Sequence, residues 1–188
     1  MNRQNDAKDL KIAVKEFIIF IDTSSLLEPG ADRFWEKIIP YLERECAKVI
    51  ILYAVYNELR VHCVQKDPSK PDLNAIAINA KNNLLRLHRD KYILFCGKRT
   101  DTFADHVFLM RFRKYMLDYN LMLITQDKNL ASDILNIGKS KSVKTQNRIM
   151  VACINIDGDL RKFNPYFPYQ PLNIPFLQKI LEKFRIFR

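Results

Sequence analysis

Four short hydrophobic runs, separated by longer stretches of helical periodicity, constrain the fold of this chain more than any other feature. The runs are rich in Ile, Leu, Val and Phe and lie at residues 17–21, 49–52, 92–95 and 121–124. In the segments between them, apolar residues recur at three- and four-residue spacing, which is typical of helices buried on one side. Buried strands that alternate with helices indicate a parallel sheet with helices on both faces.

The sequence therefore predicts an α/β fold with three layers, in which a central, mostly parallel sheet of about five strands is flanked by helices. A fifth hydrophobic run, at residues 150–156, supplies the last strand. Helices are expected at about residues 31–46, 54–66, 73–90, 103–119 and 127–137.

The chain is expected to divide into three parts. With 188 residues and 48% hydrophobic content, it can bury a proper core. We expect an N-terminal extension at residues 1–16, the main domain at 17–157, and a C-terminal part at 158–188. This last part combines a segment rich in Pro and aromatic residues with a basic amphipathic helix, which could pack on its own domain, on a partner protein or on a second copy.

Composition and charge limit the setting and the partners of the protein. No apolar run approaches the roughly 20 residues of a membrane span, and residues 1–16 are too polar for a secretory leader, so a cytoplasmic protein is expected. The four cysteines have no paired short spacing, which argues against a zinc site or a disulfide framework. The net charge of +10 favours a polyanionic partner, although ordinary solubilising charge is the alternative.

A carboxylate follows each of the four runs. Asp22 and Asp127 come directly after the first and fourth, Glu58 lies in the helix after the second, and Asp101 or Asp105 follows the third. Parallel strands end on one edge of a sheet, so these acids should gather there. Two carboxylates 4 Å apart repel by about 4 kcal/mol near a protein surface, and hence the cluster indicates a bound cation such as Mg²⁺ or Mn²⁺. Taken singly, several of these acids could simply cap helices.

Motifs around these acids together resemble the PIN domain nuclease family. They are Asp22-Thr23-Ser24 after the first strand, Val55-x-x-Glu58-Leu59, Phe103-Ala104-Asp105, and Thr125-x-Asp127-x-x-Leu130. The similarity spans about residues 17–157. It includes both the branch of the family that processes ribosomal RNA precursors and decays RNA and the small toxin branch.

This resemblance implies an endoribonuclease with a PIN-like fold. Four carboxylates would hold one or two Mg²⁺ or Mn²⁺ ions and hydrolyse RNA through a water activated by the metal: Asp22, Glu58, Asp105 and Asp127. Many family members carry two adjacent acids where this chain has Asp105 and His106, so Asp101 is a candidate additional ligand. Three hydroxyl side chains are candidates to orient ligands or waters: Thr23, Ser24 and Thr125.

Two groups of basic residues are predicted to contact nucleic acid. Lys98 and Arg99 stand just before the third acidic motif, near the predicted edge. The second group follows the last helix of the domain: Lys139, Lys141, Lys144 and Arg148. RNA is expected rather than DNA only because of the resemblance, since nothing in the composition reads a 2′-hydroxyl.

Two other functions fit the same sequence. The first is a PIN-like nucleic-acid-binding or scaffolding module with weak or no activity, which His106 in place of an acid and the C-terminal part would favour. Only the nuclease predicts metal-dependent cleavage that is lost on Asp22→Asn. The second is a phosphotransferase of the haloacid dehalogenase type with Asp22 as nucleophile, but that family has a second Asp where this chain has Ser24.

Overall fold

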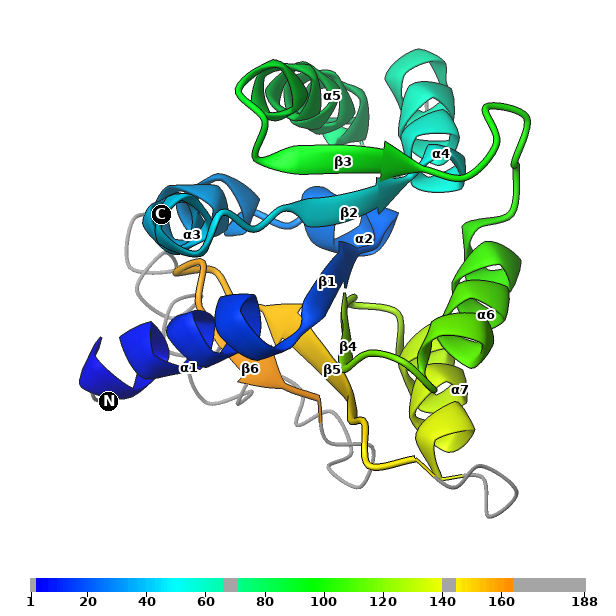
Figure 1. Cartoon of the computed structure of the whole chain (residues 1–188). Helices are drawn as coiled ribbons and strands as arrows, with labels where there is room; N and C mark the ends of the chain where they lie inside the picture. The colour runs from blue at the N-terminus through cyan, green and yellow to red at the C-terminus, as the bar shows by residue number, and fades with distance from the viewer. Residues whose placement is uncertain (1–2, 66–70, 140–144, 164–188) are drawn as a thin grey trace, which may run out of the picture.

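A computed structural model describes residues 3–65, 71–139 and 145–163, which form a three-layer α/β fold around one six-stranded sheet (Figure 1). The strand order is β3-β2-β1-β4-β5-β6. Strands β1 to β5 are parallel and β6 is antiparallel to β5, so the predicted mostly parallel sheet is confirmed, with one strand more than expected. Their bounds are β1 Ile18–Ile21, β2 Val49–Leu52, β3 Ile93–Cys96, β4 Leu121–Ile124, β5 Ile149–Ile154 and β6 Leu160–Lys162.

Helices cover both faces of this sheet. In Figure 1, α1 and α3 lie on one face and α6 and α7 on the other, while α4 and α5 pack together beside β2 and β3. The predicted helices are observed with small changes at their ends, and α2 is a short helix that the sequence did not indicate. The bounds are α1 Arg3–Glu16, α2 Thr23–Leu26, α3 Ala31–Glu45, α4 Tyr53–Val64, α5 Leu73–Arg89, α6 Ala104–Tyr115 and α7 Lys128–Gly138.

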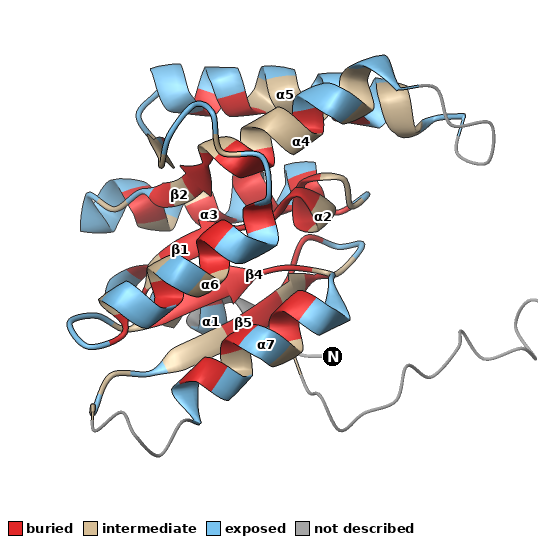
Figure 2. Ribbon diagram, turned by 90° about the vertical axis from the view of Figure 1, so that its right-hand side faces the viewer, coloured by how far each residue is buried: buried red, intermediate tan, exposed pale blue. Residues whose placement is uncertain are grey.

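The core lies between the sheet and the inward sides of the helices (Figure 2). All four residues of β4 are buried, as expected for a strand with helices on both sides. Phe20 on β1 contacts two rings of α6, with ring centroids 6.3 Å from Phe108 and 5.3 Å from Phe112. These contacts fix the position of α6 relative to the end of β1.

The connection between β5 and β6 packs on the start of α3. The Lys37 ammonium donates to the backbone oxygen of Asp157 over 2.8 Å and also bonds the carboxylate of Asp159. Burial would raise the pKa of Asp159, but the hydrogen bond and charge of Lys37 outweigh it and hold that pKa below its usual range. Gly30 lies against this connection so closely that a Cβ atom there would be 1.9 Å from the carbonyl oxygen of Asn155.

Both ends of the described chain join the domain. Three residues of α1 are buried in the common core: Leu10, Ala13 and Val14. Residues 160–162 pair with β5 and extend the sheet. The predicted C-terminal amphipathic helix lies outside the described residues. Among the helices of the described ranges, none is long and apolar enough to cross a membrane.

Candidate functional site

Asp22 and Asp127 extend from the ends of two adjacent parallel strands. Ile21 of β1 is in register with Ile124 of β4, and the backbone N–H of Asp22 donates to the Ile124 carbonyl oxygen over 2.9 Å. Only 5% of the Asp22 surface is exposed. The two aspartates therefore begin at the same edge of the sheet, where its carboxyl ends meet.

A network of hydroxyl groups holds the Asp22 carboxylate. Its Oδ2 accepts hydrogen bonds from Ser24 Oγ over 2.6 Å and from Thr125 Oγ1 over 3.0 Å. The same hydroxyl oxygens accept backbone N–H groups of the next motif, Ser24 from Gln126 over 2.9 Å and Thr125 from Asp127 over 3.0 Å. Ser24 and Thr125 thus fix the orientation of Asp22 and connect it to the start of α7.

Glu58 reaches the same edge from α4. Its Oε2 accepts the Thr23 hydroxyl over 2.7 Å and its Oε1 accepts the backbone N–H of Ala104 over 3.1 Å. Burial raises the pKa of Glu58; these two hydrogen bonds oppose that effect, while the charges of Asp22 and Asp105 add to it, and the pKa stays above its ordinary value. Glu58 is therefore both a structural link between α2 and α6 and a member of a crowded set of carboxylates.

Asp105 lies in the first turn of α6 and reaches solvent. Partial burial raises its pKa, and the charges of Asp22, Asp127 and Asp133 raise it further. Asp133, which no sequence motif indicates, occupies an exposed position on α7 and comes near Asp105 only because α6 packs on α7. We call these five electrostatically coupled residues the acidic cluster: Asp22, Glu58, Asp105, Asp127 and Asp133.

Two members of the acidic cluster also cap helices. Asp127 Oδ1 accepts the N–H groups of Asn129 over 2.7 Å and Leu130 over 3.0 Å at the start of α7, and Asp22 Oδ2 accepts the N–H of Ser24 at the start of α2. Within the described residues, no hydrogen bond reaches the second oxygen of either carboxylate. Capping uses one oxygen of each aspartate and leaves the other as a potential ligand.

The carboxylate oxygens of the acidic cluster are suitable ligands for a hard cation, but the carboxylates do not converge on one point in this structure. Carboxylate oxygens are the ligands that Mg²⁺ and Mn²⁺ prefer. Burial raises the pKa values of Glu58 and Asp105, and the negative charges of neighbouring acids add to the rise. In the described parts of the chain, however, no three His, Cys, Asp or Glu side chains converge closely enough to hold a metal ion. An ion would have to draw the carboxylates together.

Asp101 closes the turn between β3 and α6. Its Oδ2 accepts the backbone N–H of Lys98 over 2.8 Å, and Gly97 takes a left-handed φ of +100° at this turn. The Asn57 side chain of α4 donates to the carbonyl oxygens of Arg99 over 2.9 Å and Asp101 over 3.0 Å. The turn leaves Lys98 and Arg99 exposed at the edge of the sheet that carries the acidic cluster.

The second group of predicted nucleic-acid contacts lies elsewhere. Lys139 follows α7 and Arg148 precedes β5, so both lie at the amino edge of the sheet, opposite the acidic cluster. Arg148 forms an ion pair with Glu16 and lies 5.0 Å from the ring centroid of Phe17. Lys141 and Lys144 lie outside the described residues. Of the predicted basic contacts, the structure brings Lys98 and Arg99 to the edge that carries the acids.

The raised pKa of Asp105 predicts that Asp105→Asn stabilises the metal-free protein. A carboxyl group with a higher pKa in the folded state binds its proton more tightly there, so its ionisation at neutral pH lowers stability. With solvent screening, we expect a gain of roughly 0.2–1 kcal/mol, or up to about 4 °C in melting temperature in EDTA at pH 7.5.

This difference should shrink as the pH falls through the carboxyl range, because the wild-type side chain then takes up its proton. Melting curves of both proteins from pH 7.5 down to pH 4 measure it. A variant that melts below wild type at pH 7.5 would contradict the repulsion inferred for Asp105.

The fold and the site define a class: an α/β protein with a Rossmann-like sheet and an acidic cluster at the carboxyl ends of its strands. Comparison of the chain with protein-family models and with curated proteins found no match.

Proposed function

We propose that this protein is a metal-dependent endoribonuclease whose active site is the acidic cluster. The observation that carries the proposal is the gathering of acids from separate elements at one edge of the sheet: burial raises the pKa of Glu58 and of Asp105, the charge of Asp22 raises both further, and the charge of Asp127 adds to the rise for Asp105. Such an arrangement lowers the stability of the folded protein unless a cation neutralises it. The resemblance of the same motifs to PIN domain nucleases supports RNA as the substrate.

Each residue of the site has a role that its contacts support. Asp22, held by Ser24 and Thr125, presents one free carboxylate oxygen, and Asp127 presents another from the start of α7. One or two Mg²⁺ or Mn²⁺ ions bound there would activate water and stabilise the leaving oxygen of the phosphodiester. Lys98 and Arg99, exposed at the same edge, attract the phosphates that flank the cleaved bond.

The direct test is cleavage of an end-labelled RNA that contains both single-stranded and hairpin regions. Reactions with Mn²⁺, with Mg²⁺ and with EDTA should give internal cuts in the presence of a metal and none with EDTA. Cuts that persist in EDTA, or intact RNA under all three conditions, would contradict the proposal.

Metal binding should also be visible without RNA. A ligand that binds only the folded protein at 100 times its dissociation constant adds about 2.7 kcal/mol of stability, which corresponds to a rise of roughly 5–10 °C in melting temperature for a chain of this size. We expect Mn²⁺ to produce such a rise in the wild type and a much smaller one in Asp127→Asn. Equal melting temperatures with Mn²⁺ and with EDTA would count against a metal site.

The second candidate function is a nucleic-acid-binding module without catalysis. One observation favours it: no three potential ligands converge within the described residues. This module would bind RNA in EDTA and in Mn²⁺ alike, would cut it under neither condition, and would keep its affinity in Asp127→Asn. The cleavage and melting experiments therefore separate the two candidates.

A further inference from the structure

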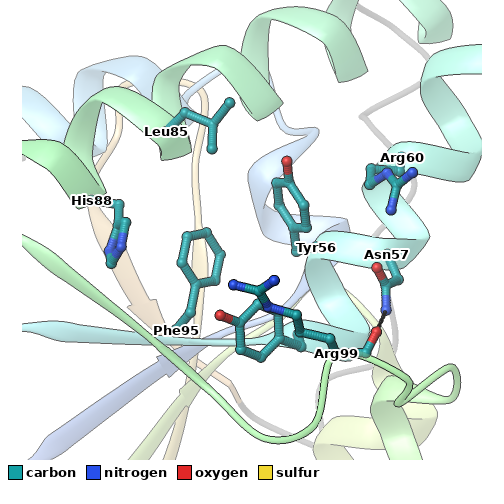
Figure 3. A pocket seen from close by; sticks show the side chains of 8 residues that line it. Tyr56, Asn57, Arg60, Leu85, His88, Phe95 and Arg99 are labelled. Carbon is teal, nitrogen blue, oxygen red and sulfur yellow. Dashed lines mark hydrogen bonds between the residues drawn. The ribbon is translucent and has the colours of Figure 1, made fainter.

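A pocket of about 340 Å³ lies between α4, α5 and the carboxyl end of β3 (Figure 3). Its lining includes three aromatic residues, two arginines and a histidine whose ring packs edge-on against Phe95: Tyr53, Tyr56, Phe95, Arg60, Arg99 and His88. None of them belongs to the acidic cluster. The pocket size suits a small planar ligand, since ligand sites commonly enclose about 300–1,000 Å³.

The aromatic wall is built around Phe95. The Tyr53 ring stacks on it at 5.4 Å with an interplanar angle of 21°, and the Tyr56 ring meets it edge-on at 5.3 Å and 70°. All three side chains are partly exposed, unlike the fully buried Phe108 of the core. Partly exposed aromatic rings that line a pocket can contact a flat ring of a ligand.

Two guanidinium groups lie beside this wall. Arg99 lies over the Tyr53 ring, with its guanidinium carbon 5.9 Å from the ring centroid, and Arg60 extends from the next turn of α4. Both side chains are exposed, and neither forms an ion pair with any residue in the described ranges. Uncompensated guanidinium groups bind phosphate oxygens, often through two hydrogen bonds at once.

The pocket is joined to the acidic cluster through α4. Asn57 lines the pocket and donates to the Arg99 carbonyl oxygen, as Figure 3 shows, and the next residue along the helix is Glu58. The pocket and the acidic cluster therefore share helix α4 and both lie toward the carboxyl ends of the strands. Partly exposed aromatic rings, arginines without an ion pair in the described ranges, and a place near the carboxyl ends of the strands together suit one nucleotide of a nucleic-acid strand.

We propose that the pocket binds one unpaired nucleotide of a single-stranded RNA, with its base against the aromatic wall and its phosphate at Arg60 and Arg99. The strand then continues over the acidic cluster; this step rests on the proposed function. A base within a duplex is already stacked and cannot enter, so the pocket selects single-stranded segments.

The test measures binding of a fluorescent ten-nucleotide single-stranded RNA to the full chain in EDTA, where no cleavage interferes. Tyr53→Leu, which keeps apolar bulk but loses the aromatic face, and Arg99→Gln should each weaken binding by roughly 5-fold or more. Arg99 is exposed, so its substitution tests the pocket even if Tyr53→Leu fails to fold.

A similar Arg–Tyr pair on α3 provides the matched controls. Arg44 lies 5.8 Å from the ring centroid of Tyr41, and neither residue lines the pocket. Tyr41→Leu and Arg44→Gln should leave the affinity within about twofold of wild type. Unchanged affinity in both pocket variants, or equal losses in pocket and control variants, would overturn the proposal.

Two further binding experiments compare the single strand with a duplex and with free nucleotides. A blunt duplex of the same sequence should bind more weakly than the single strand, and adenosine or uridine monophosphate should compete only at much higher concentration than the strand. Equal binding of the duplex would overturn the proposal, and so would competition by a free nucleotide at the concentration of the strand.

Failure of the pocket and failure of the nuclease give different results. If Arg99→Gln and Tyr53→Leu bind and cut RNA like wild type, the pocket assignment fails and the nuclease stands. If both variants lose binding while no metal supports cleavage by the wild type, the nuclease fails and the nucleotide pocket stands.

Discussion

Asp22→Asn is expected to reduce metal-dependent RNA cleavage by at least about 100-fold. Loss of residues that only support metal ligands commonly costs about 10- to 100-fold, and Asp22 is proposed to be a ligand itself. The substitution removes a negative charge yet keeps the shape of a side chain that is only 5% exposed and hydrogen-bonded to two hydroxyls. Initial rates on the end-labelled RNA, with Mn²⁺ at saturation, measure the effect.

Asp118→Asn is the matched control for this experiment. It makes the same chemical change at an exposed aspartate just before β4, at the amino edge of the sheet. Its cleavage rate should equal that of the wild type. A rate for Asp22→Asn within about threefold of wild type would remove Asp22 from the active site. Equal losses in both variants would show that the loss does not come from the Asp22 carboxylate.

Gly30→Ala is expected to destabilise the fold by about 3 kcal/mol or more. The new Cβ would lie 1.9 Å from the carbonyl oxygen of Asn155 and 3.1 Å from the backbone nitrogen of Gly158, both backbone atoms that cannot rotate away. Overpacking of this kind typically costs 1–3 kcal/mol and sometimes more. The melting temperature should therefore fall by roughly 6–12 °C.

Gly138→Ala serves as the control for that prediction. At the end of α7, a new Cβ would come 3.3 Å from the Cβ atom of Ile149, which requires a shift of only a few tenths of an ångström, and alanine favours the helix. We expect a change within about 1 kcal/mol. If Gly30→Ala melts within about 2 °C of wild type, the close packing of the β5–β6 connection on α3 is not as tight as described.

The order of the elements could be predicted because burial leaves a direct pattern in the sequence. Runs such as 121–124 form strands with both faces covered, and the observed β4 is buried along its whole length. Strand β6 escaped prediction because Leu160–Lys162 is short, has one buried residue, and pairs only at the edge of the sheet. Helix α2 was not predicted because a single helical turn is too short to show a hydrophobic periodicity.

The site was predictable to the extent that it depends on strand ends. Asp22 and Asp127 follow buried strands, and the topology alone brings them to one edge. Asp133 joins Asp105 only through the packing of α6 on α7, which no local pattern encodes. The pocket likewise combines Tyr53 and Arg60 of α4 with Phe95 of β3 and Arg99, which are about forty residues apart in the sequence.

The first turns of α4 anchor the loop between β3 and α6 at both of its ends. The Asn57 side chain donates hydrogen bonds to the carbonyl oxygens of Arg99 and Asp101, and the Glu58 carboxylate accepts the backbone N–H of Ala104 at the start of α6. Two neighbouring side chains thus hold both ends of one loop. Loss of the Asn57 side chain would therefore release the end of the loop at Arg99, while the hydrogen bond from Ala104 to Glu58 still holds the other end. Such a substitution changes the support of one side of the proposed nucleotide pocket and leaves every proposed metal ligand in the chain.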